Sequence, residues 1–560
     1  MPDQNQSTFP KIVSTNRTRE GSSHVHGCPP GKNTGPGRTL GKDWHASTMT
    51  EENSAFSPAC HGTADEIPGA KHGGNSLTEI CMGFEVHQPF RLNRFFSPEP
   101  KIRKKDLFGL YFDELNQEVL LRVSEKCYDP ATKVILEKLD EGFRCSFSLS
   151  GTLIEQLEKW SPDTLSLFDA VARHRNSEMI GQTYYHSIAS CFPDKTEFTE
   201  QVKKHSDLMY DLFRVRPTMF ENTEFTFNNE VASAVKEMGF SGIFTEGVDR
   251  ILSWRSPDYI YTCQGLPVML RNVKLSDDIA FRFGNRTWDQ FPLMADKYAD
   301  WVAADNGDVV NVFLDYETFG EHFWKETGIF NFLRFLPGEL EARGVKSVLP
   351  SDVVARHKPV GEIDVRETIS WADLEKDTSA WMGNDRQLTA FRAVQSAKKY
   401  AVDKPIWRYL QTSDHFYYMA SKFGTCGEVH SYFSHHEADE AFRTYMRILA
   451  DFEQRNIHTM KNRKSAKTLR ILTPEQAFNF AGPSGYIGHT AYSLDQFEDL
   501  LYIVPKDSLR FHQERGDFSR WINDVLGDPA LAESVNNVSE RHELTNIIQE
   551  RRDTLWSYLK

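Results

Sequence analysis

VVNVFLDYETFGEH, residues 309–322, joins an uncharged and largely apolar run to three carboxylates. Residues 309–314 have the β-branched and aromatic composition that is typical of a buried strand. Asp315, Glu317 and Glu321 then follow within seven positions. Because a solvated surface loop has no need of the apolar lead-in, the stretch predicts a buried strand that ends in a cluster of acids.

Short β-like runs alternate with longer helical patterns from Leu77 onward. The predicted strands are residues 78–86, 143–150, 178–185, 216–225, 240–247, 266–272 and 308–316. The helical patterns between them include residues 152–160, 196–213 and 228–239. Strands that alternate with crossover helices pair in parallel, with right-handed connections. The sequence therefore predicts an α/β sheet or barrel whose functional residues lie at the carboxyl ends of the strands.

Composition narrows the classes of partner. The chain has 560 residues, of which 65 are basic and 79 acidic, so its net charge is −14. This balance argues against a general attraction to nucleic acid or to anionic membranes, and leaves neutral partners open. No stretch approaches 18 consecutive apolar residues, and the N-terminus has no apolar segment long enough for a signal peptide. The eight cysteines form no CxxC pair and no cluster at zinc spacing, so we expect reduced thiols and a cytoplasmic protein.

The chain divides into four regions by composition. Residues 1–76 are rich in Gly, Ser, Thr, Asn and Pro, and are expected to form a disordered tail. Residues 77–365 contain the predicted strands. Residues 366–460 are predicted to form a helical domain packed on the barrel. The polar residues 461–468 are expected to link it to a mostly helical accessory region, residues 469–560, of unknown role.

Nearly every predicted strand ends in polar or ionisable side chains. They are His87, Gln88, Tyr184, Tyr185, His186, Glu221, Glu224, Glu246, Asp315 and Glu317. The carboxyl ends of parallel strands meet at one rim of a barrel, so we expect these groups to share a pocket.

A pair of carboxylates across a pocket is what the cleavage of a glycosidic bond requires. One attacks or stabilises the oxocarbenium-like centre and the other protonates the leaving oxygen. Glu224 and Asp315 are the candidates, since a barrel brings residues of distant strands to opposite sides of one substrate. If the strand continues past Asp315, the side-chain period of two places Glu317 on the same side. There a like charge is expected to raise the pKa of its neighbour towards that of a working acid.

Other chemistries have less support. A metal-dependent polysaccharide deacetylase also uses a seven-stranded barrel, but it needs an Asp and a pair of His at helical spacing. The nearest pair here, His430 and His435, is five residues apart. The G-x-S-x-G, P-loop and G-x-G-x-x-G signatures are absent.

Five segments resemble, in order, the five sequence regions of glycoside hydrolase family 57. They are FEVHQPF (84–90), GQTYYHS (181–187), FENTEF (220–225), LDYETFGEH (314–322) and SAWMGNDRQ (379–387). The likeness is closer to the intracellular α-amylase-like branch, in which WRYLQTSDHFYYM (407–419) and GEVHSYFS (427–434) also have counterparts. The resemblance covers roughly residues 78–460.

The resemblance implies a (β/α)7 barrel with a helical domain that completes the active site, acting on α-1,4-glucans with retention of configuration. It implies Glu224 as the nucleophile and Asp315 as the acid/base of a double displacement on an α-glucan or maltooligosaccharide. No metal and no organic cofactor is expected. The expected substrate-binding residues, strand-end side chains included, are His87, Gln88, His186, Glu317, Trp381, Asn384, Asp385 and His415.

One position departs from the family pattern. The branch usually reads FRNTE in its third region, whereas this chain reads FENTE, with Glu221 in place of the arginine. An anion three residues from Glu224 is expected to raise the pKa of Glu224 and weaken it as a nucleophile. Two alternatives therefore stay open beside hydrolysis: a 4-α-glucanotransferase that uses the same site, and a non-catalytic glucan-binding or regulatory protein.

Overall fold

Seven parallel strands form the predicted barrel in the computed structural model, which describes residues 78–402, 404–421 and 437–559. They are β1 (Glu79–Val86), β2 (Cys145–Leu149), β3 (Ser177–Ile180), β4 (Met219–Glu221), β5 (Gly242–Glu246), β7 (Leu266–Arg271) and β8 (Val309–Asp315). One sheet has the order β3-β2-β1-β8 and the other has the order β4-β5-β7. Single contacts join the two sheets at both edges: Gly181 bridges Phe220, and the Asn272 N–H donates to the Asn311 carbonyl at 2.8 Å. The seven strands predicted from the sequence are confirmed.

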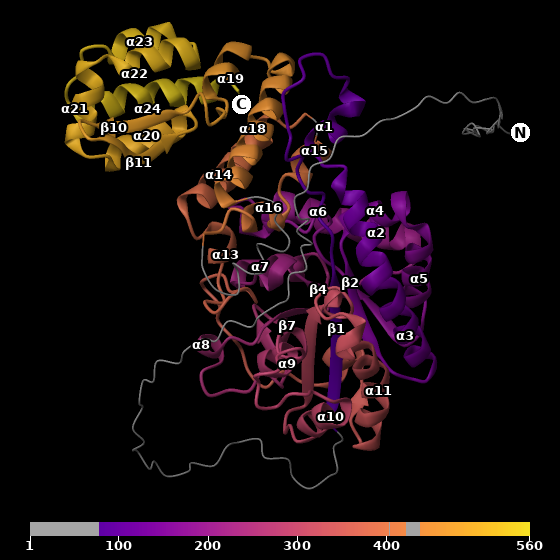
Figure 1. Cartoon of the computed structure of the whole chain (residues 1–560). Coiled ribbons are helices and arrows are strands. Elements are labelled where there is room, and N and C mark those ends of the chain that lie inside the picture. Colours follow the sequence, from indigo (N-terminus) through magenta and orange to yellow (C-terminus); the bar gives the residue numbers. More distant parts are fainter. Residues whose placement is uncertain (1–77, 403, 422–436, 560) are drawn as a thin grey trace, which may run out of the picture. The chain divides into compact units, whose positions relative to one another are not determined.

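Helices lie between the strands along the chain, and most of them cover the outside of the barrel (Figure 1). They are α1 (Leu107–Tyr111), α2 (Leu115–Val123), α3 (Asp129–Asp140), α4 (Gly151–Trp160), α5 (Pro162–Ala172), α6 (Thr196–Phe213), α7 (Asn229–Glu237), α8 (Asp249–Leu252), α9 (Val273–Ala280), α10 (Ala295–Ala303), α11 (Ile329–Ala342) and α12 (Pro350–Arg356). Two short strands complete this part: β6 (Tyr261–Cys263) pairs antiparallel with β7, and β9 (Lys346–Ser347) pairs with the start of β1. Helix α6 begins and ends at the residues that its apolar periodicity predicts.

Side chains alternate between two cores along each barrel strand. On β1, Ile80, Met82 and Phe84 pack under the outer helices, whereas Cys81 packs inside the barrel. The interior is closely filled, since a Cβ atom on Gly83 would lie 2.3 Å from the ring of Phe313. A strand's side-chain period of two therefore fixes which residue of each strand end faces the barrel axis.

The helical segment after the barrel consists of α13 (Ser379–Met382), α14 (Asp385–Ala397), α15 (Lys404–Tyr409), α16 (Ser413–Tyr417), α18 (Ala438–Asn456) and α19 (Arg463–Leu469). Its apolar faces share a core with residues of the barrel region, such as Tyr185 in a loop and Phe220 on β4. Residues 463–469 of the predicted linker region form the helix α19. Although most residues of this helix are polar, Ser465, Ala466 and Leu469 form a buried face.

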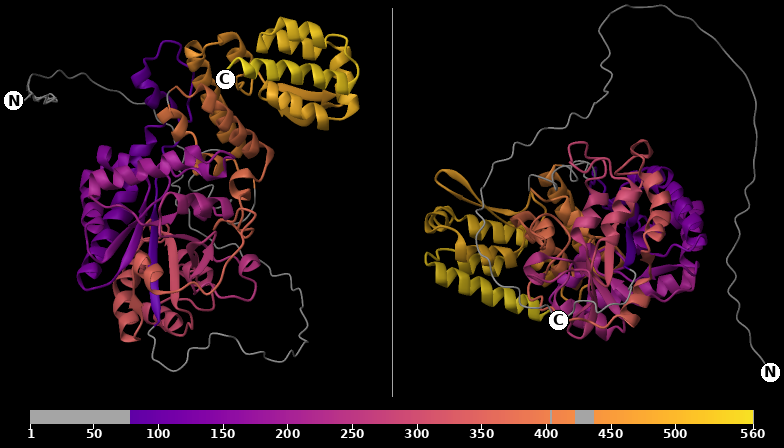
Figure 2. Two further views of the ribbon diagram at one scale, coloured as in Figure 1. Left: turned by 180° about the vertical axis from the view of Figure 1, so that it is seen from behind. Right: turned by 90° about the horizontal axis from the view of Figure 1, so that it is seen from below.

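The C-terminal region contains the hairpin β10 (Phe478–Gly482) and β11 (Gly485–Ala491) with α20 (Leu494–Ile503), α21 (Lys506–Glu514), α22 (Asp517–Trp521), α23 (Pro529–Val535) and α24 (Arg541–Ser557). These helices gather around the hairpin in both further views (Figure 2). Their buried residues form a hydrophobic core of their own, centred on rings such as Phe480 and Phe497.

Some predicted features lie outside the described residues, namely the tail at residues 1–76, the segment 427–434 and the pair His430 and His435. Among the helices of the described ranges, none has the length and apolarity needed to cross a membrane.

Candidate active site

A ring of polar side chains lines the barrel where its strands end. The alternation described above turns one residue of each strand end inward: Glu85, Ser148, Gln182, Glu221, Glu246, Arg271 and Asp315. Hydrogen bonds link neighbours in this ring, as between Gln182 Nε2 and both Glu85 Oε1 (2.9 Å) and Ser148 Oγ (2.8 Å). Since buried polar groups are costly unless they are paired, a ring of this kind marks the barrel end as the candidate site.

Glu224 leaves the sheet in a strained turn directly after β4. Its φ of 58° and the φ of 55° at Phe225 lie in the left-handed region, which residues other than glycine rarely adopt. The Asn222 amide holds the turn by donating to the Thr226 carbonyl at 2.7 Å. Strain of this kind persists where surrounding contacts impose it, often at functional sites. The turn presents the Glu224 carboxylate, 21% exposed, to the end of the barrel.

Three donors surround the Glu224 carboxylate. Trp371 Nε1 donates to Oε2 at 2.8 Å, and Ser413 Oγ donates to Oε1 at 3.1 Å. His186 Nε2 lies 3.6 Å from Oε1. Trp371 also stacks on Phe225, with ring centroids 4.7 Å apart and planes within 9° of parallel. Both oxygens of Glu224 are thus held in place from two segments far along the chain.

Asp315, the last residue of β8, has a carboxyl whose pKa lies near neutrality, so a large fraction of it is protonated there. Burial and the charge of Glu224 raise its pKa to about 7, although His186 and Arg271 act in the opposite direction. The effect of Glu224 on Asp315 means that the two carboxyls face one site. One of them can therefore donate a proton while the other is ionised.

Glu317 does not lie on the strand, because β8 ends at Asp315 and residues 316–318 form a 3₁₀ turn. Burial and the charge of Asp315 raise the pKa of Glu317 to about 8, and the Tyr128 hydroxyl donates to it. Burial and the charge of Glu224 are the first causes of the raised pKa of Asp315, and the interaction between Asp315 and Glu317 raises the pKa of Glu317. Gln88 belongs to the same corner, since its Nε2 donates to the Tyr128 hydroxyl at 3.3 Å.

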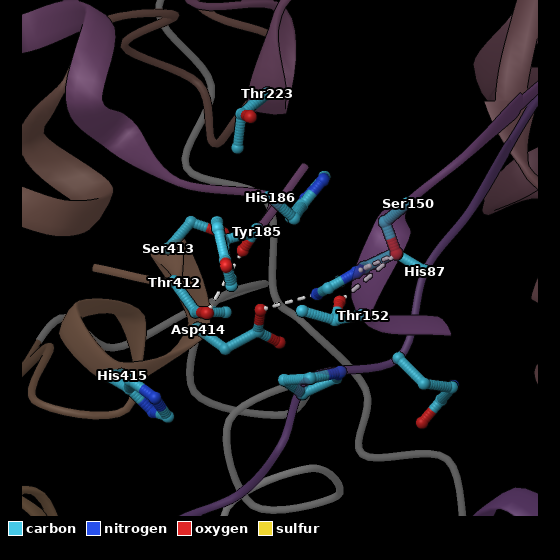
Figure 3. Close-up of polar contacts among 12 residues, drawn as sticks. His87, Ser150, Thr152, Tyr185, His186, Thr223, Thr412, Ser413, Asp414 and His415 are labelled. Atoms are coloured by element: carbon cyan, nitrogen blue, oxygen red, sulfur yellow. Dashed lines mark hydrogen bonds and ion pairs between the residues drawn. The ribbon is translucent and has the colours of Figure 1, made fainter. Parts of the chain in front are cut away.

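His87 and His186 stack face to face beside Glu224, with ring centroids 3.9 Å apart. Burial and the charge of His186 lower the pKa of His87 to about 4. His87 is then neutral: Nε2 donates to Asp414 Oδ2 at 3.0 Å and Nδ1 accepts from Ser150 Oγ at 2.7 Å (Figure 3). Burial opposes a charge on His186 too, but Glu224, Glu85 and Asp414 outweigh it and raise the pKa of His186 to about 9. The site therefore pairs one neutral imidazole with one imidazolium.

Asp414 is a site residue that the sequence reasoning missed. Burial disfavours its charge, but His87 and His186 more than compensate and hold its pKa below its usual range. The motif SDHFYYM contains both Asp414 and His415, and only His415 was selected from it. His415 lies apart from the contact between His87 and Asp414 (Figure 3), and its Nε2 meets the Tyr409 carbonyl at 3.1 Å.

The remaining predicted residues lie in or on the helical segment. Trp381 is 1% exposed and belongs to its hydrophobic core. Asn384 caps α14, accepting from the Gln387 N–H at 3.0 Å and donating to the Met419 carbonyl. Asp385 is exposed in the first turn of that helix. The structure thus brings Glu224, Asp315 and the two histidines together with Asp414 and Trp371, and gives Trp381 and Asn384 interior and capping contacts.

Comparisons with known proteins identify relatives of this chain. The family model described as glycosyl hydrolase family 57 matches residues 81–366. A candidate α-amylase of Methanocaldococcus jannaschii is 43% identical over 395 residues, which cover 67% of this chain and 84% of that protein.

Two solved structures share the fold. They are family 57 branching enzymes of Pyrococcus horikoshii, at 13% identity, and of Thermococcus kodakaraensis, at 11% identity. Each match has a TM-score of 0.50 and covers 70% of this chain and 90% of the other.

Proposed function

The chain belongs to glycosyl hydrolase family 57 and is a glycoside hydrolase, and we propose that it cleaves α-1,4-linked glucans by a double displacement that retains anomeric configuration. The relative described as a candidate α-amylase supports the substrate class. The observation that carries the proposal is the coupling of the two carboxyls: the charge of Glu224 helps to keep Asp315 protonated.

In the first step Glu224 attacks the anomeric carbon. The bond from that carbon to the leaving oxygen breaks, and the proton of Asp315 passes to that oxygen. The donors Trp371, Ser413 and His186 fix the orientation of the attacking carboxylate. A covalent glycosyl ester on Glu224 results, and Asp315 is left as a carboxylate.

The second step follows from the same coupling. Esterified Glu224 carries no charge, so one cause of the raised pKa of Asp315 is gone and its carboxylate becomes a stable base. Asp315 takes a proton from water, whose oxygen attacks the anomeric carbon and releases Glu224. The imidazolium of His186, 3.6 Å away, favours the return of negative charge to Glu224.

Chromatography of the products from maltoheptaose tests the proposal. Shorter maltooligosaccharides alone are expected, with the newly formed reducing ends in the α configuration by proton NMR. Longer products as well would mean that a sugar hydroxyl replaces water, which is the 4-α-glucanotransferase alternative. If the protein leaves a range of α-glucans untouched while it binds them, the catalytic proposal fails and the glucan-binding alternative takes its place.

The Trp371→Phe variant is expected to lower kcat about 10- to 100-fold, because it removes a hydrogen bond to a charged group. Phenylalanine retains the stack on Phe225, so the fold is kept. Trp254→Phe, at a side chain that is 83% exposed, is the matched control. Steady-state kinetics with maltoheptaose measure both variants, and equal kcat values would show that Trp371 does not position Glu224.

We place the protein in the cytoplasm. Free thiols support this location, and in the described part of the chain they belong to Cys81, Cys127, Cys145, Cys191 and Cys263. The acidic net charge of −14 supports a neutral glucan, rather than nucleic acid or an anionic membrane, as the partner.

A further inference from the structure

Two buried carboxyls in the barrel ring take no part in the mechanism. Glu85 on β1 is 2% exposed and Glu221 at the end of β4 is 0% exposed. Glu85 Oε1 accepts from Gln182 at 2.9 Å, and Glu221 Oε2 accepts from Ser148 at 3.0 Å. The side chains of the two acids lie within hydrogen-bonding reach of each other.

The second oxygen of each carboxyl does not accept from Gln182 or Ser148. Glu85 Oε2 and Glu221 Oε1 are buried and have no close hydrogen-bond partner among the described residues; the Phe225 N–H, which donates to the Asn222 carbonyl, also lies near Glu221. Two carboxylates have only acceptors to offer each other, so their contact is unfavourable without a hydrogen between them. One proton on the pair turns the contact into a hydrogen bond and satisfies both oxygens.

The charge balance of the ring leads to the same result. Arg271 pairs with Glu246 at 3.1 Å and with Asp277 at 2.6 Å, so its positive charge is balanced by carboxylates other than Glu85 and Glu221. Within the described ranges, the cation in contact with the pair is His186, whose Nδ1 lies 3.4 Å from Glu85 Oε1. Two full charges at this depth would share one imidazolium with Glu224.

The other titratable groups around the pair are themselves acidic or neutral. Glu224 lies near Glu221, and Glu317 lies near Glu85. His87 stacks on His186 and is neutral. Burial raises the pKa of both Glu85 and Glu221, that of Glu221 to about 7, in agreement with a retained proton.

We propose that Glu85 and Glu221 share one proton as a carboxylic acid–carboxylate pair, and that its single negative charge holds His186 as the imidazolium that faces Glu224. The pair positions the catalytic group through His186 and does not touch substrate. This role rests on the proposed function, in which Glu224 is the nucleophile. The pair also changes the description of Glu221: its charge is shared with Glu85 and its Oε2 accepts from Ser148, so Glu221 is not a full anion beside Glu224.

The pKa of the His186 imidazole, followed by NMR of protein with isotope-labelled histidine, tests the pair without substrate. The resonance is assigned with His186→Gln. In Glu221→Gln the amide replaces the shared proton as the donor to Glu85 and keeps the acceptor for Ser148, so the net charge of the pair is unchanged. We expect the pKa of His186 to stay where it is in the unmodified protein. In the double variant Glu85→Gln/Glu221→Gln the negative charge is gone, and a fall of about one unit or more is expected.

Each contrary result is distinct. A fall of the His186 pKa in Glu221→Gln alone would mean that both carboxyls are ionised. An unchanged pKa in the double variant would mean that both are protonated or that the pair does not act on His186.

An infrared difference spectrum between Glu221→Gln and the unmodified protein gives a second test that does not need the double variant to fold. The loss of one carboxylic acid band with no loss of carboxylate absorption is expected. Loss of a carboxylate band instead would overturn the shared proton. Neither measurement depends on turnover, so the pair can fail while the proposed hydrolysis stands, and the reverse.

Discussion

Glu224→Gln is expected to lower kcat on maltoheptaose by at least about 10⁴-fold, since the amide cannot form the glycosyl ester. The amide is close in shape: its oxygen can accept from Trp371 while its NH2 donates to the Ser413 hydroxyl oxygen, so substrate binding and thermal stability should change little. Steady-state kinetics give the loss, and a thermal unfolding curve shows that the fold is retained.

Glu237→Gln is the matched control, because it makes the same change at an exposed side chain at the end of α7. It should leave kcat unaltered. Glu224→Ala offers a further check, since the space that it opens admits azide. A glycosyl azide of inverted configuration is expected from an activated substrate. Residual hydrolysis by Glu224→Gln within about tenfold of the unmodified rate would remove Glu224 from the role of nucleophile.

Asp315→Asn is expected to lower kcat on maltoheptaose by about 10²- to 10⁴-fold, the usual contribution of a general acid. The unmodified protein should lose kcat/KM as the pH rises above about 7, because the pKa of Asp315 lies there and the first step needs its protonated form. That alkaline limb should vanish in the variant.

The leaving group separates this role from a structural one. The fluoride ion leaves α-maltosyl fluoride without being protonated, so the variant should react with this substrate at a rate close to that of the unmodified protein. Asp305→Asn, at a carboxylate near Asp258 on another part of the barrel, is the control for the same substitution. An equal loss on the fluoride and on maltoheptaose would contradict the assignment of Asp315 as the acid.

Much of the site could be predicted because its chemistry lies at strand ends. Short β-like runs located β1, β4 and β8, and the acids and histidines that follow them converge for reasons of topology. His87, His186, Glu224 and Asp315 could therefore be named before any coordinates were known.

The missed residues come from segments whose placement depends on tertiary packing. Trp371 lies beyond the barrel strands, and Asp414 is carried by the five-residue helix α16, so no local period relates either to Glu224. The choice between Asp414 and His415 depends on which face of α16 meets the barrel. The condition set for Glu317, a strand that continues past Asp315, is not met, because residues 316–318 form a 3₁₀ turn.

For the same reason, the sequence could not predict that Glu85 and Glu221 of the polar ring lie together. Each acid is visible in its motif, FEVHQPF or FENTEF, but they belong to strands β1 and β4 of different sheets. Only the tertiary arrangement of the two sheets makes them neighbours. A sequence comparison therefore counts Glu221 as the loss of a cation, whereas in the folded chain it belongs to a pair.

Trapping the intermediate tests the central claim most directly. The protein is incubated with a slowly hydrolysed 2-deoxy-2,2-dihaloglycosyl or 5-fluoroglycosyl substrate of the α-glucosyl series, digested, and examined by mass spectrometry. A glycosyl adduct on the peptide that contains Glu224, absent from Glu224→Gln, is the predicted result. A productive reaction with no adduct and with β-configured products, or an adduct on another carboxylate, would contradict the double displacement at Glu224.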